Sequence, residues 1–293
     1  MNEAESDAAA LFEAERRHLM GLAYRMLGSL AEAEDAVQEA YLRWHAADRK
    51  GVASPRAFLS TVVTRLCLEL LKSARNRREA YVGPWLPEPV LDTAALDAET
   101  ASEYAQDLSV ALMLTLERLS PLERAAFLLH DVFDVDFAGV AQALGRSEAA
   151  CRQLATRARE HVRAARPRFT PSAEESERLA AAFRQAATSG DASAMTRLLA
   201  ADAVLYSDGG GKRLAALNPI HGADKIARFF SGVMKKEDAS GWRVRAARVN
   251  GLAGFVFADA EGALRTVAFD IHDGRIVAIY LVVNPDKLQR VAF

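Results

Sequence analysis

The sequence predicts a multidomain chain in which two all-helical segments are followed by an α+β domain. Apolar residues recur about every 3.6 positions in residues 8–80 and again in residues 108–168, which is typical of amphipathic helices. From residue 174 onward, helical patterns give way to runs rich in β-branched and aromatic residues, which indicate an antiparallel sheet. The length of 293 residues accommodates two or three domains, and no apolar run approaches the roughly 18 residues of a membrane span.

The first helical segment, residues 8–80, is expected to hold three helices. The second of them carries a polar face with Asp35, Gln38 and Glu39 opposite its apolar face. Ser54-Pro55, an N-cap followed by proline at the first helical position, starts the third helix. That helix ends in "KSARNRR", a basic run that suits either a solvated helix C-terminus or a nucleic-acid backbone.

Residues 81–107 form an expected linker between domains. "GPWLPEPV", which starts at Gly83, contains three prolines and therefore excludes a helix or a central strand. Residues 79–107 carry seven acidic side chains and no lysine or arginine. This acidic charge keeps the linker away from polyanions, as in a solvated spacer.

The second helical segment, residues 108–168, contains a helix-turn-helix pattern. A short helix from Phe137 is followed by a turn at Gly145-Arg146 and by a helix that Ser147 caps. Residues 147–168 carry six arginines against two glutamates. Arginine and glutamine on an exposed helix neutralise phosphates and contact base edges in a major groove, although a basic solvated helix in a bundle explains the same pattern.

The third segment, residues 174–293, contains two helices, a strand near 203–208, a helix near 222–236 and four strand-like runs. Asp273-Gly274 joins the last two runs and predicts a hairpin. "DGGGK" at 208–212 is not a phosphate-binding loop, because no Ser or Thr follows Lys212 and a strand rather than a helix is expected next. Its glycines form either a plain hairpin tip or a place where the backbone approaches a partner closely.

Several stretches together resemble a known family. "AEDAVQEAYLRW", "SPRAFLSTVVTRLCLELLKSARNRRE" and "RLSPLERAAFLLHDVFDVDFAGVAQALGRSEAACRQLATRARE" resemble the two domains of a bacterial extracytoplasmic-function sigma factor. "GPWLPEP", "DGGGK" and "NPDKL" resemble the signature motifs of the sigma factors that carry a SnoaL-like C-terminal extension. The resemblance implies two all-α sigma domains followed by the cone-shaped α+β fold of SnoaL-like and NTF2-like proteins.

The same resemblance implies a function and its residues. The chain is expected to bind core RNA polymerase, to recognise promoter DNA and to start transcription, under regulation by its own C-terminal domain rather than by a separate anti-sigma protein. Polymerase contacts are expected from Asp35, Gln38 and Glu39. Minus-ten contacts are expected from Arg65, Lys72, Arg75, Asn76, Arg77 and Arg78, and minus-thirty-five contacts from Ser147, Arg152, Gln153, Thr156, Arg157 and Arg159. Contacts between domains are expected from Trp85 as an apolar anchor, Leu86, Pro87, Glu88, Asp208, Gly209, Gly210, Gly211, Lys212, Asn284, Pro285, Asp286 and Lys287.

No catalytic residue, metal or cofactor is expected. Cys67 and Cys151 lie at apolar helical positions without metal-ligand spacing, which indicates reduced, buried thiols. Asp270 and His272 share strand parity and would form an acid/base pair only if their side is the interior of the cone. The first ten residues are acidic and lack a basic n-region, so we expect a cytoplasmic protein with no membrane partner.

Two other classes of protein are open at this stage. One is a DNA-binding regulator fused to a small-molecule-binding or cyclase-like enzyme domain, because the fold of the third segment hosts both functions. The other is a dimeric repressor with a ligand domain, against which the polar face of the second helix argues.

Overall fold

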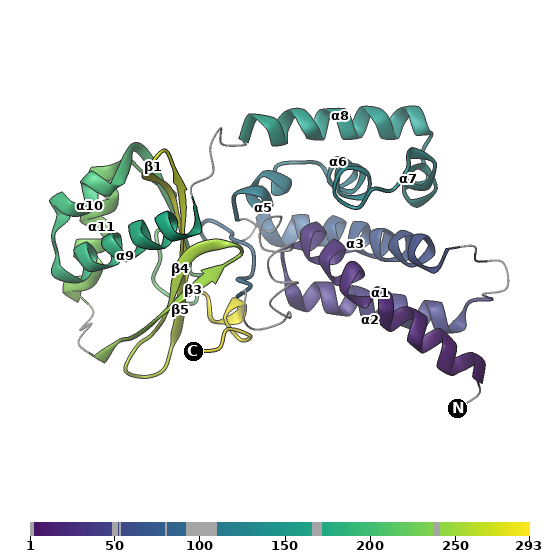
Figure 1. Cartoon of the computed structure of the whole chain (residues 1–293), viewed down its shortest axis with the longest axis horizontal. Coiled ribbons are helices and arrows are strands. Elements are labelled where there is room, and N and C mark those ends of the chain that lie inside the picture. Colours follow the sequence, from purple (N-terminus) through teal and green to yellow (C-terminus); the bar gives the residue numbers. More distant parts are fainter. Residues whose placement is uncertain are drawn as a thin grey trace. The chain divides into compact units, whose positions relative to one another are not determined.

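The chain divides into two compact units in the computed structural model (Figure 1). The first unit comprises Met1–Glu79 and Leu112–Arg166, and the second comprises Ala80–Ala111 and Pro167–Phe293. The two helical segments therefore share one unit, whereas the proline-rich linker belongs with the C-terminal domain. The structure describes residues 3–48, 52, 54–79, 81–91, 110–165, 172–236 and 241–293, with the backbone alone for 3–7, 73–79 and 164–165.

The first unit is helical throughout its described part. Its elements are α1 (Glu3–Leu27), α2 (Leu30–Ala46), α3 (Pro55–Glu79), α5 (Val110–Glu117, which begins two residues before the unit's second segment), α6 (Pro121–Phe127), the π-helix η2 (Leu128–Val132), α7 (Phe137–Leu144) and α8 (Glu148–Ala165). Helices α1, α2 and α3 pack on one another, and α3 also contacts α6 and α7. The two sequence segments of this unit are consequently joined by direct packing.

The predicted helix-turn-helix is confirmed. Helix α7 ends at Gly145, whose φ of 62° is left-handed and which lacks the Cβ that would make this conformation costly. Ser147 caps α8 by accepting a hydrogen bond from the backbone N–H of Ala150 at 3.3 Å. Cys151, Ala155 and Ala158 are fully buried on the inner face of α8, as the helical period predicts, so its arginines lie outward.

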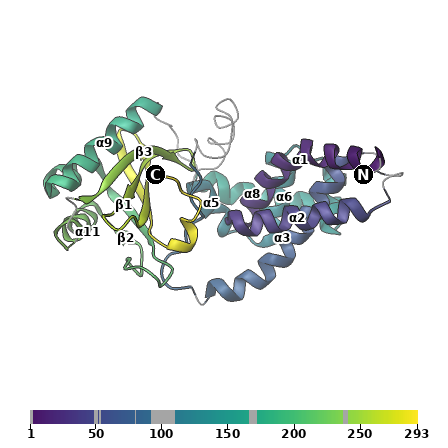
Figure 2. The ribbon, with the colours of Figure 1, turned by 90° about the horizontal axis from the view of Figure 1, so that it is seen from below.

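In its described part, the second unit packs three α-helices on a six-stranded sheet. Its elements are α9 (Ala173–Ser189), α10 (Ala192–Leu198), β1 (Leu199–Asp208), β2 (Ile220–His221), α11 (Ala223–Lys236), β3 (Arg243–Val249), β4 (Leu252–Ala258), β5 (Leu264–His272), β6 (Arg275–Val282) and the 3₁₀-helix η4 (Pro285–Lys287). The strand order is β2-β1-β6-β5-β4-β3, with β1 parallel to β6 and the other neighbours antiparallel. Figure 2 shows α9 and α11 with the sheet.

The main core of this unit lies between the helices and one face of the sheet. Phe183 of α9 contacts Phe230 of α11 and Phe269 of β5, with ring centroids 5.2 and 5.4 Å apart. The predicted hairpin is confirmed, because Asp273 and Gly274 both have positive φ (50° and 68°) in a two-residue turn between β5 and β6. Asparagine, aspartate and glycine tolerate this conformation better than other residues.

Among the described residues of this unit, α9, α10 and α11 do not cover the opposite face of the sheet. Linker residues 81–91 and the C-terminal residues after β6 lie on that side (Figure 1). Leu86 is 1% exposed, and Leu91 forms an isolated antiparallel bridge with Val249. The backbone N–H of Asn250 also donates to the carbonyl of Val90 at 2.7 Å, so the linker is hydrogen-bonded to the edge of the sheet.

The strand expected directly after Lys212 is absent from the described chain. The backbone N–H groups of Lys212 and Arg213 both bond to the carbonyl of Gly209, which closes a tight turn. Residues 214–219 then form an irregular loop in which Leu214 is 90% exposed, and β2 is only two residues long. No helix within the described residues is both long and apolar enough to cross a bilayer.

Candidate linker-docking and promoter-contact sites

A buried carboxylate holds the linker on the C-terminal domain. Asp208 ends β1 on the face of the sheet opposite α9 and α11, and it is 0% exposed. Its two carboxylate oxygens accept hydrogen bonds from the Tyr81 hydroxyl at 2.5 Å and from the Leu86 backbone N–H at 2.8 Å. Both donors belong to the linker, so one side chain satisfies two linker groups that would otherwise be buried without partners.

Lys287 supplies the positive charge that this buried carboxylate requires. Its ammonium lies 2.8 Å from Asp208 Oδ2 and donates to the carbonyl of Leu86 at 2.5 Å. It also lies 4.2 Å from the ring centroid of Trp85 and 5.0 Å from that of Tyr81. Hydrogen bonds, an opposite charge and two aromatic faces together compensate the desolvation of the ammonium.

Asn284 completes the docking cluster, which we define as Tyr81, Leu86, Asp208, Asn284 and Lys287. Its Nδ2 donates to the Tyr81 hydroxyl at 2.9 Å, and its own backbone N–H donates to the Asp208 carbonyl at 3.0 Å. Burial and the hydrogen bond to Asp208 raise the pKa of Tyr81, so its hydroxyl keeps its proton and donates. The cluster therefore joins three segments that are far apart in sequence.

The glycines of "DGGGK" fit closely against this cluster. A Cβ on Gly210, whose φ is +58°, would lie 2.2 Å from Asn284 Nδ2. A Cβ on Gly211 would lie 3.3 Å from the side chain of Val82 in the linker, and one on Gly209 would lie 2.3 Å from the Arg213 carbonyl oxygen. Close backbone approach, rather than a free hairpin tip, is what these glycines allow.

The remaining predicted contact residues lie around the cluster in different environments. Leu86, not Trp85, is the deepest apolar residue of the linker, since Trp85 is only half-buried beside Lys287. Pro87 and Glu88 are buried, and Pro285 opens η4. Lys212 pairs with Asp286 at 2.6 Å, and both side chains are more than half exposed.

The acidic part of the predicted linker after Leu91, up to residue 107, lies outside the described residues.

The predicted polymerase contacts lie on the outer face of α2. Asp35 and Gln38 are exposed, and Glu39 is partly exposed and paired with Arg43 one turn later at 2.9 Å. The apolar side of the same helix is buried, with Trp44 at 1% exposure. This arrangement leaves an acidic, polar surface available to a partner.

Arg65 of α3 lies against the first helix of the helix-turn-helix. Its guanidinium donates to the carbonyls of Gln142 at 2.7 Å and Ala143 at 3.0 Å. These carbonyls belong to the C-terminal turn of α7, where a cation complements the helix dipole. Lys72 is exposed further along α3, and the side chains of Arg75, Asn76, Arg77 and Arg78 lie outside the described part of the chain.

Arg124 is a second tie between the two segments of the first unit, and sequence reasoning missed it. It is 3% exposed, and its Nη1 donates to the carbonyl of Met26, near the end of α1, at 2.6 Å. It also bonds to the Leu116 carbonyl and the Glu117 carboxylate, both at 2.8 Å. Burial lowers its pKa to about 10, so it stays charged at neutral pH. An arginine directly before the apolar run "AAFLL" was the available signal.

His18 marks the same packing region. Its Nε2 lies 3.0 Å from the Ser60 hydroxyl, and its ring meets Phe133 edge-on at 4.8 Å. Burial is the main cause that lowers the pKa of His18, followed by the positive charge of Arg56. Glu15 acts in the opposite direction and Arg25 lowers the pKa further. The imidazole is therefore neutral at pH 7.

The outer face of α8 presents the predicted minus-thirty-five residues. Gln153, Thr156 and Arg157 are exposed. Arg152 pairs with Glu148 at 2.7 Å, and Arg159 pairs with Asp131 at 2.6 Å. The hydroxyl of Ser147 caps the helix, as described above.

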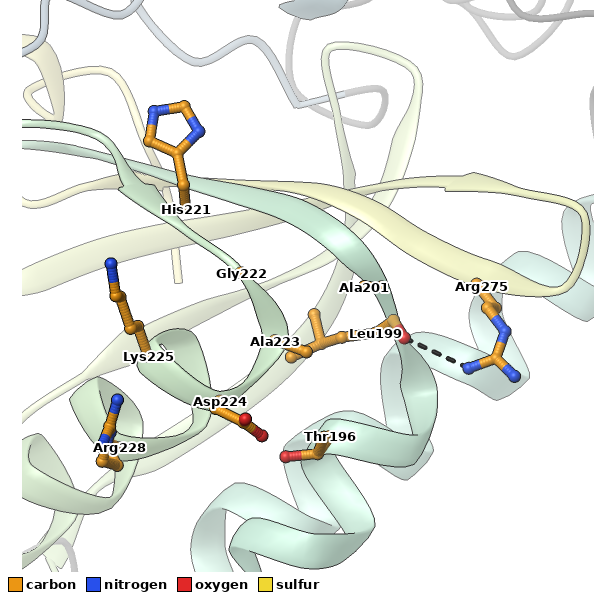
Figure 3. Close-up of a pocket in the computed structure, with 10 residues that line it drawn as sticks. All are labelled: Thr196, Leu199, Ala201, His221, Gly222, Ala223, Asp224, Lys225, Arg228 and Arg275. Atoms are coloured by element: carbon orange, nitrogen blue, oxygen red, sulfur yellow. Dashed lines mark hydrogen bonds between the residues drawn. The ribbon is translucent and has the colours of Figure 1, made fainter.

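Asp270 and His272 do pair at 2.8 Å, but they alternate with core residues and so face away from the interior. A hollow of about 450 Å³ lies at the start of α11, and the side chains of His221 and Arg275 at its wall point in different directions (Figure 3). No group of three or more His, Cys, Asp or Glu in the described chain is placed to hold a metal. The two cysteines are buried free thiols, as expected.

This geometry defines a class of protein. A helical unit with a helix-turn-helix and a linker docked on a cone-shaped α+β domain is the architecture of a transcription initiation factor with a C-terminal extension. Family models agree: Sigma-70 region 2 matches residues 11–77, and Sigma-70 region 4 matches residues 109–162.

Comparison with individual proteins identifies the family to which the chain belongs. The chain is 42% identical to the ECF RNA polymerase sigma factor SigJ of Mycobacterium tuberculosis over 94% of this chain and 91% of SigJ. It is also 29% identical to the probable ECF RNA polymerase sigma factor SigI of that species, over 96% of this chain and 94% of SigI. The crystal structure of M. tuberculosis SigJ superposes with a TM-score of 0.78 at 39% identity and covers 96% and 98% of the two chains. The chain belongs to the extracytoplasmic-function sigma factors, with a SnoaL-like C-terminal domain.

Proposed function

We propose that the C-terminal domain regulates this sigma factor in cis by holding the linker between the two promoter-binding regions. The observation that carries the proposal is the docking cluster, in which Asp208 and Lys287 bind linker groups inside the second unit. The linker connects α3 to α5. A domain that holds it therefore constrains the geometry that the two regions can adopt on a promoter.

We further propose that α8 contacts the minus-thirty-five element through Gln153, Thr156 and Arg157, and that α3 contacts the minus-ten element through Arg65, Lys72 and the basic run at 75–78. Arginines and glutamine on an exposed helix supply both phosphate and base-edge contacts. Asp35, Gln38 and Glu39 provide a surface for core RNA polymerase on α2.

In this proposal, the packed first unit is a closed form that cannot contact both promoter elements at once. Two elements centred about 25 base pairs apart are separated by about 85 Å along the duplex, at about 3.4 Å per base pair. Helices α3 and α7 are hydrogen-bonded through Arg65, so they must separate before both regions contact their elements. Binding to polymerase is the step that we propose to open them.

A regulatory rather than enzymatic role of the C-terminal domain is favoured by its polar groups. The one acid–imidazole pair considered from the sequence, Asp270 with His272, faces away from the interior of the domain. Acid/base chemistry on a bound substrate requires both groups within hydrogen-bond reach of it.

The test uses full-length protein with core RNA polymerase and a library of promoter templates. Leu86→Ser places a hydroxyl at a linker position that is 1% exposed, and the matched control Val82→Ser changes a linker position that is 50% exposed. We expect the wild type, Leu86→Ser and Val82→Ser all to start transcription. Leu86→Ser should change the amount of transcript at least threefold on templates of at least one spacing between the two elements. Val82→Ser should stay within twofold of the wild type on every template.

Two outcomes separate the parts of the proposal. Hydrogen exchange over residues 81–91 reports directly whether Leu86→Ser has released the linker. Release of the linker with unchanged transcription would remove regulation in cis. Failure of all three proteins to start RNA synthesis from any template would remove the initiation function itself.

A further inference from the structure

The C-terminal domain contains a second feature that linker docking does not use. A cavity of about 240 Å³ lies between α9, α11 and the helix-covered face of β3 to β6. Its lining residues are Phe183, Arg184, Ala187, Thr188, Phe229, Phe230, Val233, Met234, Trp242, Val244, Phe255, Phe257, Arg265, Val267, Phe269 and Leu281. The docking cluster lies on the opposite face of the same sheet, so the two sites are separate.

Seven of the sixteen lining residues are aromatic. The ring centroid of Phe255 lies 6.0 Å from that of Phe257 and 6.3 Å from that of Phe269. The ring of Trp242 meets that of Phe257 edge-on, with centroids 6.1 Å apart. Edges and faces of rings at these separations are the surroundings that another aromatic ring prefers. An engineered apolar cavity of about 150 Å³ binds benzene, so this larger cavity has room for a fused two-ring system or for one ring with a substituent.

Two guanidinium groups give the cavity a charge. Arg184 lies 5.4 Å from the centroid of Phe255, and its Nε is buried without a hydrogen-bond acceptor among the described residues. Arg265 stacks over Trp242 at 4.1 Å, with Asp259 3.6 Å from its Nη2. A buried N–H without an acceptor is unfavourable, and a bound anion would remove that cost.

The described lining residues include no carboxylate, imidazole or thiol. Such a wall has no general acid or base of ordinary pKa to act on a bound molecule. It also repels a ligand cation, because its only ionised groups are arginines. The cavity is therefore suited to binding an anion rather than to converting it.

We propose that this cavity binds a small, flat aromatic carboxylate, with the ring among the phenylalanines and the carboxylate on Arg184. Planar guanidinium and carboxylate groups make paired hydrogen bonds, which lysine does not reproduce. The proposal is independent of regulation through the linker.

The test titrates full-length protein with 2-naphthoate by isothermal calorimetry and follows tryptophan fluorescence in parallel. We expect saturable binding of one 2-naphthoate per chain, and at least tenfold weaker binding of the cation 2-naphthylmethylammonium. Arg184→Met, which keeps the apolar stem, should weaken 2-naphthoate binding at least tenfold. The control Arg178→Met, at an exposed position of the same helix, should leave it within twofold.

The outcomes decide the proposal even if a variant folds poorly. Arg184→Lys keeps the charge and should bind 2-naphthoate with an affinity between those of the wild type and Arg184→Met. Hydrogen exchange should show ligand protection of α11 and β4 rather than of residues 81–91. The proposal is wrong if wild-type protein shows no saturable binding, if the cation binds as well as the acid, or if Arg184→Met binds like Arg178→Met.

Discussion

Replacing Asp208 with asparagine tests how strongly the linker is docked. Asp208 is 0% exposed and accepts from Tyr81, from the Leu86 backbone and from the Lys287 ammonium. Asparagine has nearly the same shape but carries no charge and one acceptor oxygen in place of two. The substitution therefore leaves the partly buried ammonium of Lys287 without its counter-ion.

The expected cost follows from that burial. Removing one partner of a buried ion pair costs about 3–5 kcal/mol, because the other charge stays buried without compensation. Since asparagine retains one acceptor, we expect the lower end, about 3 kcal/mol. A loss of that size in the free energy of local opening speeds hydrogen exchange about 150-fold, at about 1.4 kcal/mol for each factor of ten.

The assay is hydrogen exchange of the backbone amides in residues 81–91, measured on full-length protein. Asp286→Asn is the matched control, since Asp286 forms a pair with Lys212 in which both side chains are more than half exposed. Exposed pairs contribute about 0–1 kcal/mol, so the control should speed exchange by no more than about fivefold. Equal exchange in the two variants would refute the reasoning that Asp208 holds the linker.

Three further predictions address the glycines, the closed packing and promoter contact. Gly210→Ala should lower the urea midpoint of the C-terminal domain more than Gly190→Ala does. Both positions have positive φ, which costs about 1–2 kcal/mol for an L-residue, but only at Gly210 would the Cβ collide with a neighbour. His18 is held neutral in the fold and has a pKa near 6.5 when unfolded, so the unfolded state binds more protons once the pH falls below about 6.5. Wild-type stability should then fall by at most about 1.4 kcal/mol per pH unit between pH 6.5 and 5, and His18→Gln should lose less, as urea titrations at several pH values would show. Arg157→Ala should lower the salt dependence of the polymerase–promoter complex by about one unit of the log–log slope, as for a lost phosphate contact, whereas Arg178→Ala should not.

The local elements were predictable because their signals are local. Gly145 and Ser147 mark the turn and cap of the helix-turn-helix within three residues of each other, and Asp273-Gly274 marks a hairpin on its own. The prediction of a strand directly after Lys212 was wrong because the turn before it has no local sequence signal for its end. The bonds of Lys212 and Arg213 to the Gly209 carbonyl extend the turn past the lysine, and this depends on how the glycines fold.

The sites depend on pairs that are distant in sequence. Asp208 and Lys287 are 79 positions apart, and Tyr81 lies 127 positions before Asp208, so no periodicity links them. Family resemblance brought their motifs to one place but did not say which atoms meet. It also named Trp85 as the apolar anchor, whereas Leu86 is the residue that is 1% exposed.

Arg124 illustrates a signal that was present and unused. Charged residues are almost never fully buried without a partner, so an arginine on an apolar helix face implies an acceptor elsewhere in the fold. Its acceptor at Met26 lies 98 positions earlier, and only packing of α6 on α1 brings the two together. A buried arginine thus predicts that a contact exists but not where it is.

The docking cluster and the contacts of Arg65 and Arg124 within the helical unit differ in how readily they break. This difference bears on which of them opens first. Undocking the linker breaks its hydrogen bonds to Asp208, Asn284 and Lys287, each worth about 1 kcal/mol net, and exposes Leu86, which is 1% exposed in the docked form. The Asp208–Lys287 pair lies within the C-terminal domain and is not broken. Arg65 instead donates to two carbonyls from an exposed position, where water replaces the lost hydrogen bonds and a net cost of about 1 kcal/mol per bond applies. Arg124 keeps its bonds to Leu116 and Glu117 when Met26 departs, so its release is also partly compensated. Polymerase binding therefore has less work to do in separating α3 from α7 than in freeing the linker. In the regulation that we propose, the linker therefore stays with the C-terminal domain during opening, and that domain would act through its position rather than through repeated undocking.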